Sequence, residues 1–223
     1  GIAEQHAMTF AGGLACNNMK PIVAIYSTFL QRAYDQLIHD IVVQDLDILL
    51  AIDRAGIVGA DGETHQGIYD ISFLRILPKI IIMAPSDESE MVKMLTTGYK
   101  HKGLAAVRYP RGNITGVDYE KDLMNSVPIG KANVVRKGVD IAYLVFGTML
   151  SSIKKVADSN NATVIDMRFV KPIDEDIIVE VCGSHRYIFT VEDNTILGGA
   201  GSAVNEVLVK YGVNKIVKNL GIP

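Results

Sequence analysis

Cationic and phenolic side chains recur where apolar runs of the sequence end. Tyr26 and Arg32 follow one such run, Arg54 follows a second, and Arg111 follows a third. Guanidinium groups form paired hydrogen bonds with phosphate and carboxylate oxygens, and a phenol supplies a further donor. One such arginine is most simply explained by a surface ion pair. Their recurrence favours a site for a small phosphorylated or carboxylated ligand.

A glycine-rich segment follows the second of these runs and carries Asp61 and His65 between Gly56 and Gly67. It lacks Gly-Lys-Ser/Thr, so it is not a P-loop, and its spacing is not that of a dinucleotide-binding fingerprint. It fits either a mobile surface loop or an active-site lid. Asp61 and His65 have no third or fourth ligand at a matching spacing, so we do not expect a metal site there.

The elements that must position these side chains alternate along the chain. In the first half we predict strands at 21–27, 47–53, 80–84 and 105–109, and helices at 3–17, 29–44, 70–77 and 87–101, the last capped by Ser86. Short strands without polar alternation, separated by helices, indicate a parallel sheet covered on both faces. Ligands of such sheets bind beyond the carboxyl ends of the strands, where the arginines are expected.

The alternation lapses in a polar stretch between residues 112 and 127 and then resumes. In the second half we predict strands at 139–146, 163–169, 187–192 and 215–217, a hairpin arm at 132–137, and helices at 150–158, 172–182 and 200–211. The predicted fold class is α/β, with two parallel or mixed-sheet domains that have helices on both faces. We expect these domains at 1–115 and 127–223, joined by a linker at 116–126.

The composition excludes several classes of protein. The chain has 223 residues, a net charge of −3, 48% hydrophobic residues and 21% charged residues. These values exclude wholesale disorder, and the acidic balance argues against nucleic-acid binding. No apolar run reaches the ~18 residues of a membrane span, so we expect no membrane association. Cys16 and Cys182 are too few for a disulfide framework and indicate reduced thiols in the cytoplasm. Because the chain begins at Gly1 and ends at Pro223 without natural-looking termini, we expect a fragment.

Six blocks of the sequence stand out together: GIAEQHAM at 1–8, YSTFLQRAY at 26–34, IDRAGIVGADGETHQG at 52–67, MAPSD at 83–87, RYPRG at 108–112 and TVEDNTILGGAG at 190–201. In this order they resemble the 1-deoxy-D-xylulose-5-phosphate synthases, thiamine-diphosphate enzymes of the transketolase superfamily. The resemblance covers essentially the whole chain. It implies a pyrimidine-binding domain and a transketolase C-terminal domain, without the N-terminal domain that holds Mg²⁺ and the diphosphate of the cofactor, and without the family's last stretch.

The resemblance also implies an activity. Enzymes of this family use thiamine diphosphate and Mg²⁺ to condense pyruvate with D-glyceraldehyde 3-phosphate. They release carbon dioxide and form 1-deoxy-D-xylulose 5-phosphate, the first step of the non-mevalonate isoprenoid pathway, which also feeds thiamine and pyridoxal synthesis. We expect a homodimer, and we expect this fragment alone to be inactive.

Individual residues take roles from the same resemblance. Glu4 is the carboxylate implied to hydrogen-bond N1′ of the aminopyrimidine ring, and Phe29 is implied to stack on that ring. His65 is implied as a catalytic proton donor or stabiliser of an oxygen, and His6 as a second catalytic histidine near the cofactor. The substrate-binding positions of the family are matched by Tyr26, Arg32, Arg54, Asp61, His65 and Arg111.

Two other interpretations stay open at this point. The chain could come from another thiamine-diphosphate enzyme, such as a transketolase or the β-subunit of a 2-oxo-acid dehydrogenase. A dehydrogenase that hands its acyl group to lipoamide has no need of Tyr26, Arg54 and Arg111 as a clamp for an aldehyde phosphate. A non-catalytic α/β module that binds an anion or serves in assembly would make Glu4 dispensable.

Overall fold

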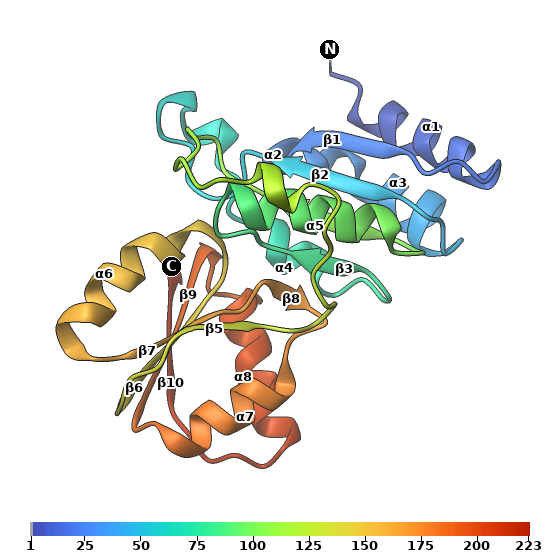
Figure 1. The fold of residues 1–223 in the computed structure, drawn as a ribbon. Helices are drawn as coiled ribbons and strands as arrows, with labels where there is room; N and C mark the ends of the chain where they lie inside the picture. Colours follow the sequence, from blue (N-terminus) through green and yellow to red (C-terminus); the bar gives the residue numbers. More distant parts are fainter. Residues whose placement is uncertain (1) are drawn as a thin grey trace.

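The protein contains two five-stranded sheets, which lie one above the other in Figure 1. The computed structural model describes residues 2–223. The first sheet has the order β1-β2-β4-β3-β8. Four of its strands are parallel: β1 (Ile22–Tyr26), β2 (Leu49–Asp53), β4 (Ala105–Arg108) and β3 (Ile81–Met83). The strands β2, β3 and β4 are buried almost throughout, as their unbroken apolar runs predict.

Helices cover both faces of the first sheet. On one face lie α1 (Glu4–Cys16), the helical segment from Ser27 to Val42 and α4 (Asp70–Leu74), whose apolar side chains share one core with those of β1 and β2. On the other face, α5 (Glu88–Lys100) packs through Met94 against Leu49 and Met83. The predicted parallel sheet covered on both faces is confirmed for this half.

Two details of this half differ from the prediction. The helix predicted at 29–44 is interrupted, because it consists of α2 (Ser27–Leu30), a 3₁₀ turn, α3 (Tyr34–Gln36) and a π-helical turn ending at Val42. The backbone of Ala33 leaves the helical region, with φ −104° and ψ 16°, and this breaks the regular hydrogen-bond ladder. Asp87 rather than Ser86 caps α5, accepting a hydrogen bond of 2.9 Å from the Glu90 amide.

The second sheet has the order β10-β9-β6-β7-β5. Its strands are β5 (Asn133–Arg136), β6 (Ile141–Val145), β7 (Thr163–Asp166), β9 (Tyr187–Thr195) and β10 (Val217–Ile222), and only β5 is antiparallel to its neighbour. One face is covered by α6 (Leu150–Asn160), and the other by α7 (Glu175–Ser184) and α8 (Ala200–Lys210). The predicted α/β class with two mostly parallel sheets is therefore confirmed.

The second half also differs from the prediction in two places. The arm predicted at 132–137 forms no hairpin with the next strand, because β5 pairs with the more distant β7. The strand predicted at 163–169 is two strands. It stops at Asp166, Arg168 takes a positive φ of 57°, and the chain continues as β8 (Phe169–Lys171) in the first sheet, antiparallel to β3.

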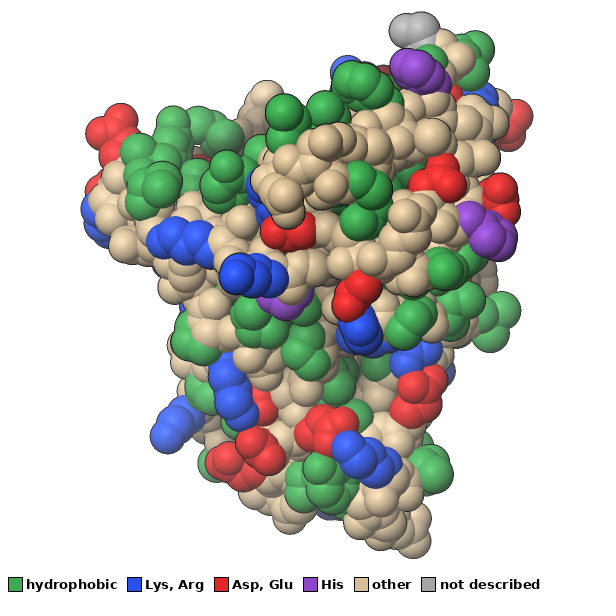
Figure 2. All heavy atoms as spheres, turned by 90° about the vertical axis from the view of Figure 1, so that its right-hand side faces the viewer, with side chains coloured by type: hydrophobic (Ala, Val, Ile, Leu, Met, Phe, Trp, Pro, Cys, Tyr) green, Lys and Arg blue, Asp and Glu red, His purple; other side chains and the backbone are tan. Residues whose placement is uncertain are grey.

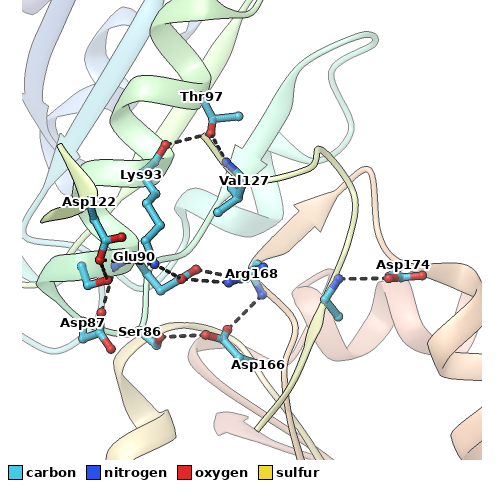
Figure 3. Close-up of polar contacts among 12 residues, drawn as sticks. Ser86, Asp87, Glu90, Lys93, Thr97, Asp122, Val127, Asp166, Arg168 and Asp174 are labelled. Carbon is cyan, nitrogen blue, oxygen red and sulfur yellow. Dashed lines mark hydrogen bonds and ion pairs between the residues drawn. The ribbon is translucent and has the colours of Figure 1, made fainter. Parts of the chain in front are cut away.

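A buried polar network joins the two halves at this crossing (Figure 3). Ser86 donates a hydrogen bond of 2.7 Å to the carboxylate of Asp166. Arg168 holds Glu90 of α5 through two N–O contacts of 2.7 and 2.9 Å. Asp166 is 2% exposed, and burial raises its pKa to about 6. These contacts, together with β8, fix one half against the other.

The described residues form short helices and, on one face, a surface of mixed charge (Figure 2). No helix within residues 2–223 is both long and apolar enough to cross a membrane. On the face shown in Figure 2, Lys and Arg side chains are interspersed with Asp and Glu side chains. That face therefore has no broad basic patch of the kind that binds nucleic acid without sequence preference.

Candidate functional site

The carboxyl ends of β1, β2 and β4 lie side by side in the first sheet. In the register of the sheet, Tyr26 is paired with Asp53, and Ile52 is paired with Arg108. The residues that follow each strand therefore meet at one edge, as the strand-end argument predicts. Eight of the nine predicted site residues lie in one connected group at this edge: Glu4, Tyr26, Phe29, Arg32, Arg54, Asp61, His65 and Arg111.

Arg54 stands at the centre of the cationic part of this group. Its Nε donates a hydrogen bond of 2.9 Å to Asp61, its NH1 lies 2.9 Å from Asp53, and its guanidinium stacks 3.9 Å above the ring of Tyr26. The hydrogen bond to Asp61 raises the pKa of Arg54 above its ordinary value. Arg111, which is half exposed, approaches the second oxygen of Asp61 at 3.2 Å. One carboxylate thus bridges two arginines that belong to different strand ends.

The glycine-rich segment is a closed loop that carries Asp61 and His65. Gly56 and Gly67 pair through two backbone hydrogen bonds of 2.7 and 2.9 Å, which form the neck of the loop. A Cβ on Gly67 would collide with the backbone oxygen of Arg54, so only glycine fits there. Two 3₁₀ turns inside the loop place Asp61 and His65 toward the strand ends. The ring of His65 lies edge-on to Phe29, with 5.2 Å between ring centroids.

The rings of Tyr26 and Phe29 are stacked with 5.6 Å between their centroids, and a cavity of about 430 Å³ opens beside them. Its lining includes Glu4, Tyr26, Phe29 and Arg32, together with apolar side chains of β1, of α1 and of the two residues before α1. The guanidinium of Arg32 lies 4.6 Å over the ring of Phe29, and its NH1 lies 3.6 Å from Oε1 of Glu4. The other carboxylate oxygen of Glu4 is buried and has no hydrogen-bond partner.

The unpartnered oxygen of Glu4 indicates what the cavity can hold. A buried acceptor without a donor is unfavourable by about 1–3 kcal/mol, so such atoms mark positions where a ligand supplies the missing donor. Phe29 offers an aromatic face next to it once Arg32 moves aside. A flat heteroaromatic ring with a protonated nitrogen fits this combination of an aromatic face, a carboxylate and apolar walls.

His6 is the predicted site residue that the structure does not bring into this group. It lies on α1 two residues after Glu4, which is more than half a turn around the helix. Its ring is exposed and is stacked on Phe10, with 6.0 Å between the ring centroids. It does not line the cavity that Glu4 lines.

A second charged cluster behind the site was not predicted. Arg108 is 3% exposed and donates to both oxygens of Asp70, at 2.7 and 3.3 Å, and to Asp193 of β9, at 2.5 Å. Burial lowers the pKa of Arg108, but the carboxylates of Asp193 and Asp70 outweigh it and leave the pKa above its ordinary value. Two signals in the sequence bear on this cluster: Arg108 lies near the end of a predicted strand, and β9 ends in the polar run from Glu192 to Thr195.

Comparisons with known proteins agree with this architecture. Residues 1–116 match the family described as the pyrimidine binding domain of transketolase, and residues 130–223 match the transketolase C-terminal domain. Over its whole length, the chain is 58% identical to 1-deoxy-D-xylulose-5-phosphate synthase of Hahella chejuensis and 58% identical to that of Shigella dysenteriae. It covers 34% and 36% of these relatives, so it spans about a third of their length.

A solved structure shows the same arrangement of both halves. It is described as a split gene transketolase in an inactive β4 tetramer, and it superposes with a TM-score of 0.88 at 26% sequence identity. The superposition covers 98% of this chain and 72% of that chain.

Proposed function

The chain belongs to the transketolase family, and from this membership we propose that it forms the aminopyrimidine and acceptor side of a 1-deoxy-D-xylulose-5-phosphate synthase. The proposed reaction condenses pyruvate with D-glyceraldehyde 3-phosphate, with loss of carbon dioxide. The observation that carries the proposal is that the two bridged arginines connect to the Glu4 cavity through Tyr26, which lines the cavity and stacks under Arg54. A phosphate clamp next to a ring-binding cavity suits a sugar-phosphate acceptor that must meet a thiamine cofactor.

Glu4 and Phe29 are the residues proposed to hold the aminopyrimidine ring. The buried oxygen of Glu4 accepts a hydrogen bond from a protonated ring nitrogen, which removes the unfavourable state of that atom. Phe29 supplies the stacking face, and Arg32 must leave this face for the ring to enter. When bound, thiamine diphosphate supplies the electron sink that permits loss of carbon dioxide from pyruvate.

Arg54, Arg111 and Tyr26 are proposed to bind the phosphate of the aldehyde. Each charge-assisted hydrogen bond contributes about 1.5–3 kcal/mol net, so a dianion that meets two guanidinium groups competes well with the single charge of Asp61. Asp61 keeps the arginines together until the acceptor arrives. It therefore preorganises the clamp.

His65 is proposed to hold a proton at the oxygen of the reacting carbonyl. Its Nδ1 lies 3.0 Å from the hydroxyl of Thr64, which leaves Nε2 as the nitrogen available to a substrate. An imidazole placed at a developing oxyanion stabilises it as a donor. His6 is exposed in this chain, and we propose that it lies near the cofactor in the complete enzyme.

The remaining parts of the proposal concern the complete protein. No cluster of His, Cys, Asp or Glu within residues 2–223 could hold a metal ion, and we assign the ligands of Mg²⁺ and diphosphate to another part of the full-length protein. We propose a cytoplasmic homodimer, with a pyrimidine-binding domain at 1–115, a linker at 116–126 and a C-terminal domain at 127–223. We propose that this chain is inactive alone, as the similar split-gene transketolase tetramer is described to be.

The test uses the full-length gene product with thiamine diphosphate and Mg²⁺. Pyruvate consumption is followed with and without D-glyceraldehyde 3-phosphate, for the wild type, Glu4→Ala and the control Glu180→Ala, an exposed carboxylate on α7. We expect aldehyde-dependent turnover that falls at least about 100-fold in Glu4→Ala and is unchanged in the control. Turnover that does not depend on the aldehyde would refute the synthase and favour a dehydrogenase β-subunit.

A further inference from the structure

We propose that Asp193, in the C-terminal half of the chain, is a positioning residue for the acceptor loop, defined here as residues 54–67. This loop carries Arg54, Asp61 and His65. The inference rests on the proposed function only in taking this loop as the place where the aldehyde phosphate binds. Three consecutive residues at the end of β9, from Asp193 to Thr195, contact the loop neck and the segment that leaves it.

Asp193 contacts the neck from the side of Gly56. Gly56 has a positive φ of 78°, and a Cβ built on it would collide with the carboxylate of Asp193. The side chain of Asp193 therefore packs directly on the backbone of Gly56. Because Gly56 is hydrogen-bonded to Gly67 in both directions, a shift of Asp193 moves both strands of the neck.

The next two residues of β9 hold the segment that leaves the loop. The amide of Thr195 donates a hydrogen bond of 2.8 Å to the backbone oxygen of Ile68, one residue after Gly67. Asn194 is fully buried, accepts from the amide of Ile71 at 3.2 Å and donates to the hydroxyl of Ser72 at 3.0 Å. The loop is thus held at both ends of its neck by one strand of the other half.

Arg108 fixes Asp193 in turn. It comes from β4, and its neighbour Tyr109 accepts a backbone hydrogen bond of 2.9 Å from Ala55, at the start of the loop. Arg108 also holds Asp70 through two hydrogen bonds, so it stays paired when Asp193 is neutralised. The substitution Asp193→Asn removes the charge that Arg108 holds, so this side chain is fixed less firmly against Gly56, and it leaves no buried cation alone because Arg108 keeps Asp70.

A looser neck should weaken the binding of the aldehyde phosphate more than that of the other reactants. Arg54 lies two residues before the neck, and Asp61, which aligns Arg54 with Arg111, lies inside the loop. A looser neck separates these groups and weakens the phosphate clamp. Glu4 and the cavity on α1 contact neither Asp193 nor the neck, so binding of the cofactor should not change. His65 also lies on this loop, so poorer placement of its proton should lower kcat, whereas KM for pyruvate should not change.

The experiment compares Asp193→Asn with a matched control, Asp166→Asn, in the full-length holoenzyme. Asp166 is likewise a carboxylate at the junction of the two halves, but it accepts a hydrogen bond from Ser86 (Figure 3), and none of its hydrogen bonds reaches residues 54–67. The first readout is hydrogen exchange of the peptide that covers residues 56–67. The second is the pair of KM values for pyruvate and D-glyceraldehyde 3-phosphate.

We expect Asp193→Asn to speed exchange in this peptide at least about 10-fold and to raise KM for the aldehyde at least about 10-fold, a change of about 1.4 kcal/mol. KM for pyruvate should stay within about twofold. Equal exchange in the two variants, or equal changes in both KM values, would overturn the inference. Absence of aldehyde-dependent turnover in the wild type would refute the proposed function instead, and the exchange comparison would still decide whether Asp193 holds the loop.

Discussion

Replacing Arg108 by glutamine should lower the free energy of unfolding of the chain by about 3–5 kcal/mol, the range found when one partner of a buried ion pair is removed. Arg108 lies between Asp70, which is fully buried, and Asp193, whose side chain is 14% exposed. Without the guanidinium, the carboxylate of Asp70 stays in a region without access to solvent, and that of Asp193 stays largely shielded from it. Glutamine can donate to one oxygen but brings no charge.

The two carboxylates should not contribute equally to this loss. Asp70 has no access to solvent, whereas Asp193 reaches the surface and can be hydrated. Adding Asp70→Asn to Arg108→Gln removes the charge that is hardest to solvate. We therefore expect the double variant to recover about 2 kcal/mol, which is within the coupling range of contacting residues.

Urea unfolding followed by far-UV circular dichroism measures these values, since the chain has no tryptophan for fluorescence. With an m-value of about 3 kcal/mol/M, the upper end for small proteins, the midpoint should fall by about 1–1.7 M for Arg108→Gln. The exposed control Arg186→Gln should stay within about 0.5 kcal/mol of the wild type. A midpoint for Arg108→Gln equal to that of the control, or a double variant less stable than the single one, would show that the buried pair is not what stabilises this junction.

Three further predictions concern other parts of the molecule. Burial raises the pKa of Asp166 to about 6, above its ordinary 3.8, so the folded state binds this proton more tightly than the unfolded chain. Its contribution to stability therefore falls as pH rises from about 4 to 6, and Asp166→Asn should remove about 3 kcal/mol of that pH dependence in unfolding titrations. Gly56→Ala should destabilise the chain by about 2 kcal/mol and Gly59→Ala by about 1 kcal/mol, because both have positive φ but only Gly56 packs against a side chain; equal urea midpoints for the two would contradict this. In the full-length enzyme, Arg54→Lys should raise KM for the aldehyde phosphate at least about 10-fold and leave KM for pyruvate unchanged, since lysine cannot reproduce the paired guanidinium contacts.

The regular elements could be predicted because their apolar patterns are local. The run from Asp47 to Asp53 has no polar alternation and forms β2, a strand buried on both faces. In the segment from 29 to 44, the apolar spacing correctly predicted a buried face, since Leu30, Ala33, Leu37 and Ile41 have no solvent exposure. The spacing did not reveal that the turns between these residues alternate between α, 3₁₀ and π hydrogen bonding, which packing decides.

Pairings between distant segments could not be predicted in the same way. The apolar character of the chain continues through Phe169, so a single strand was expected, and nothing local shows that the chain changes sheets near Arg168. The same holds for β5, whose partner β7 lies about thirty residues further along the chain. Such pairings depend on long-range contacts that a local pattern does not contain.

For the site residues, too, a local pattern could be predicted from the sequence and a long-range contact could not. Arg54 and Arg111 could be predicted because Arg54 directly follows β2 and Arg111 comes three residues after β4, and the geometry of parallel sheets places strand ends together. Arg108 is absent from the predicted site because its role depends on Asp70 and Asp193, which lie 38 and 85 residues away in the sequence. A buried arginine becomes interpretable only when its partners are known.

The strand β8 has a consequence for how this protein can be divided or recombined. It belongs by sequence to the second half, yet it covers the outer edge of β3 in the first sheet. A piece ending in the polar linker would leave that edge with free N–H and C=O groups, a known template for intermolecular strand pairing and aggregation. A chimera that exchanges the C-terminal half with a homologue must therefore bring a β8 that matches Ile82 and Met83. The two halves must therefore be kept together or exchanged together, even though each has its own sheet.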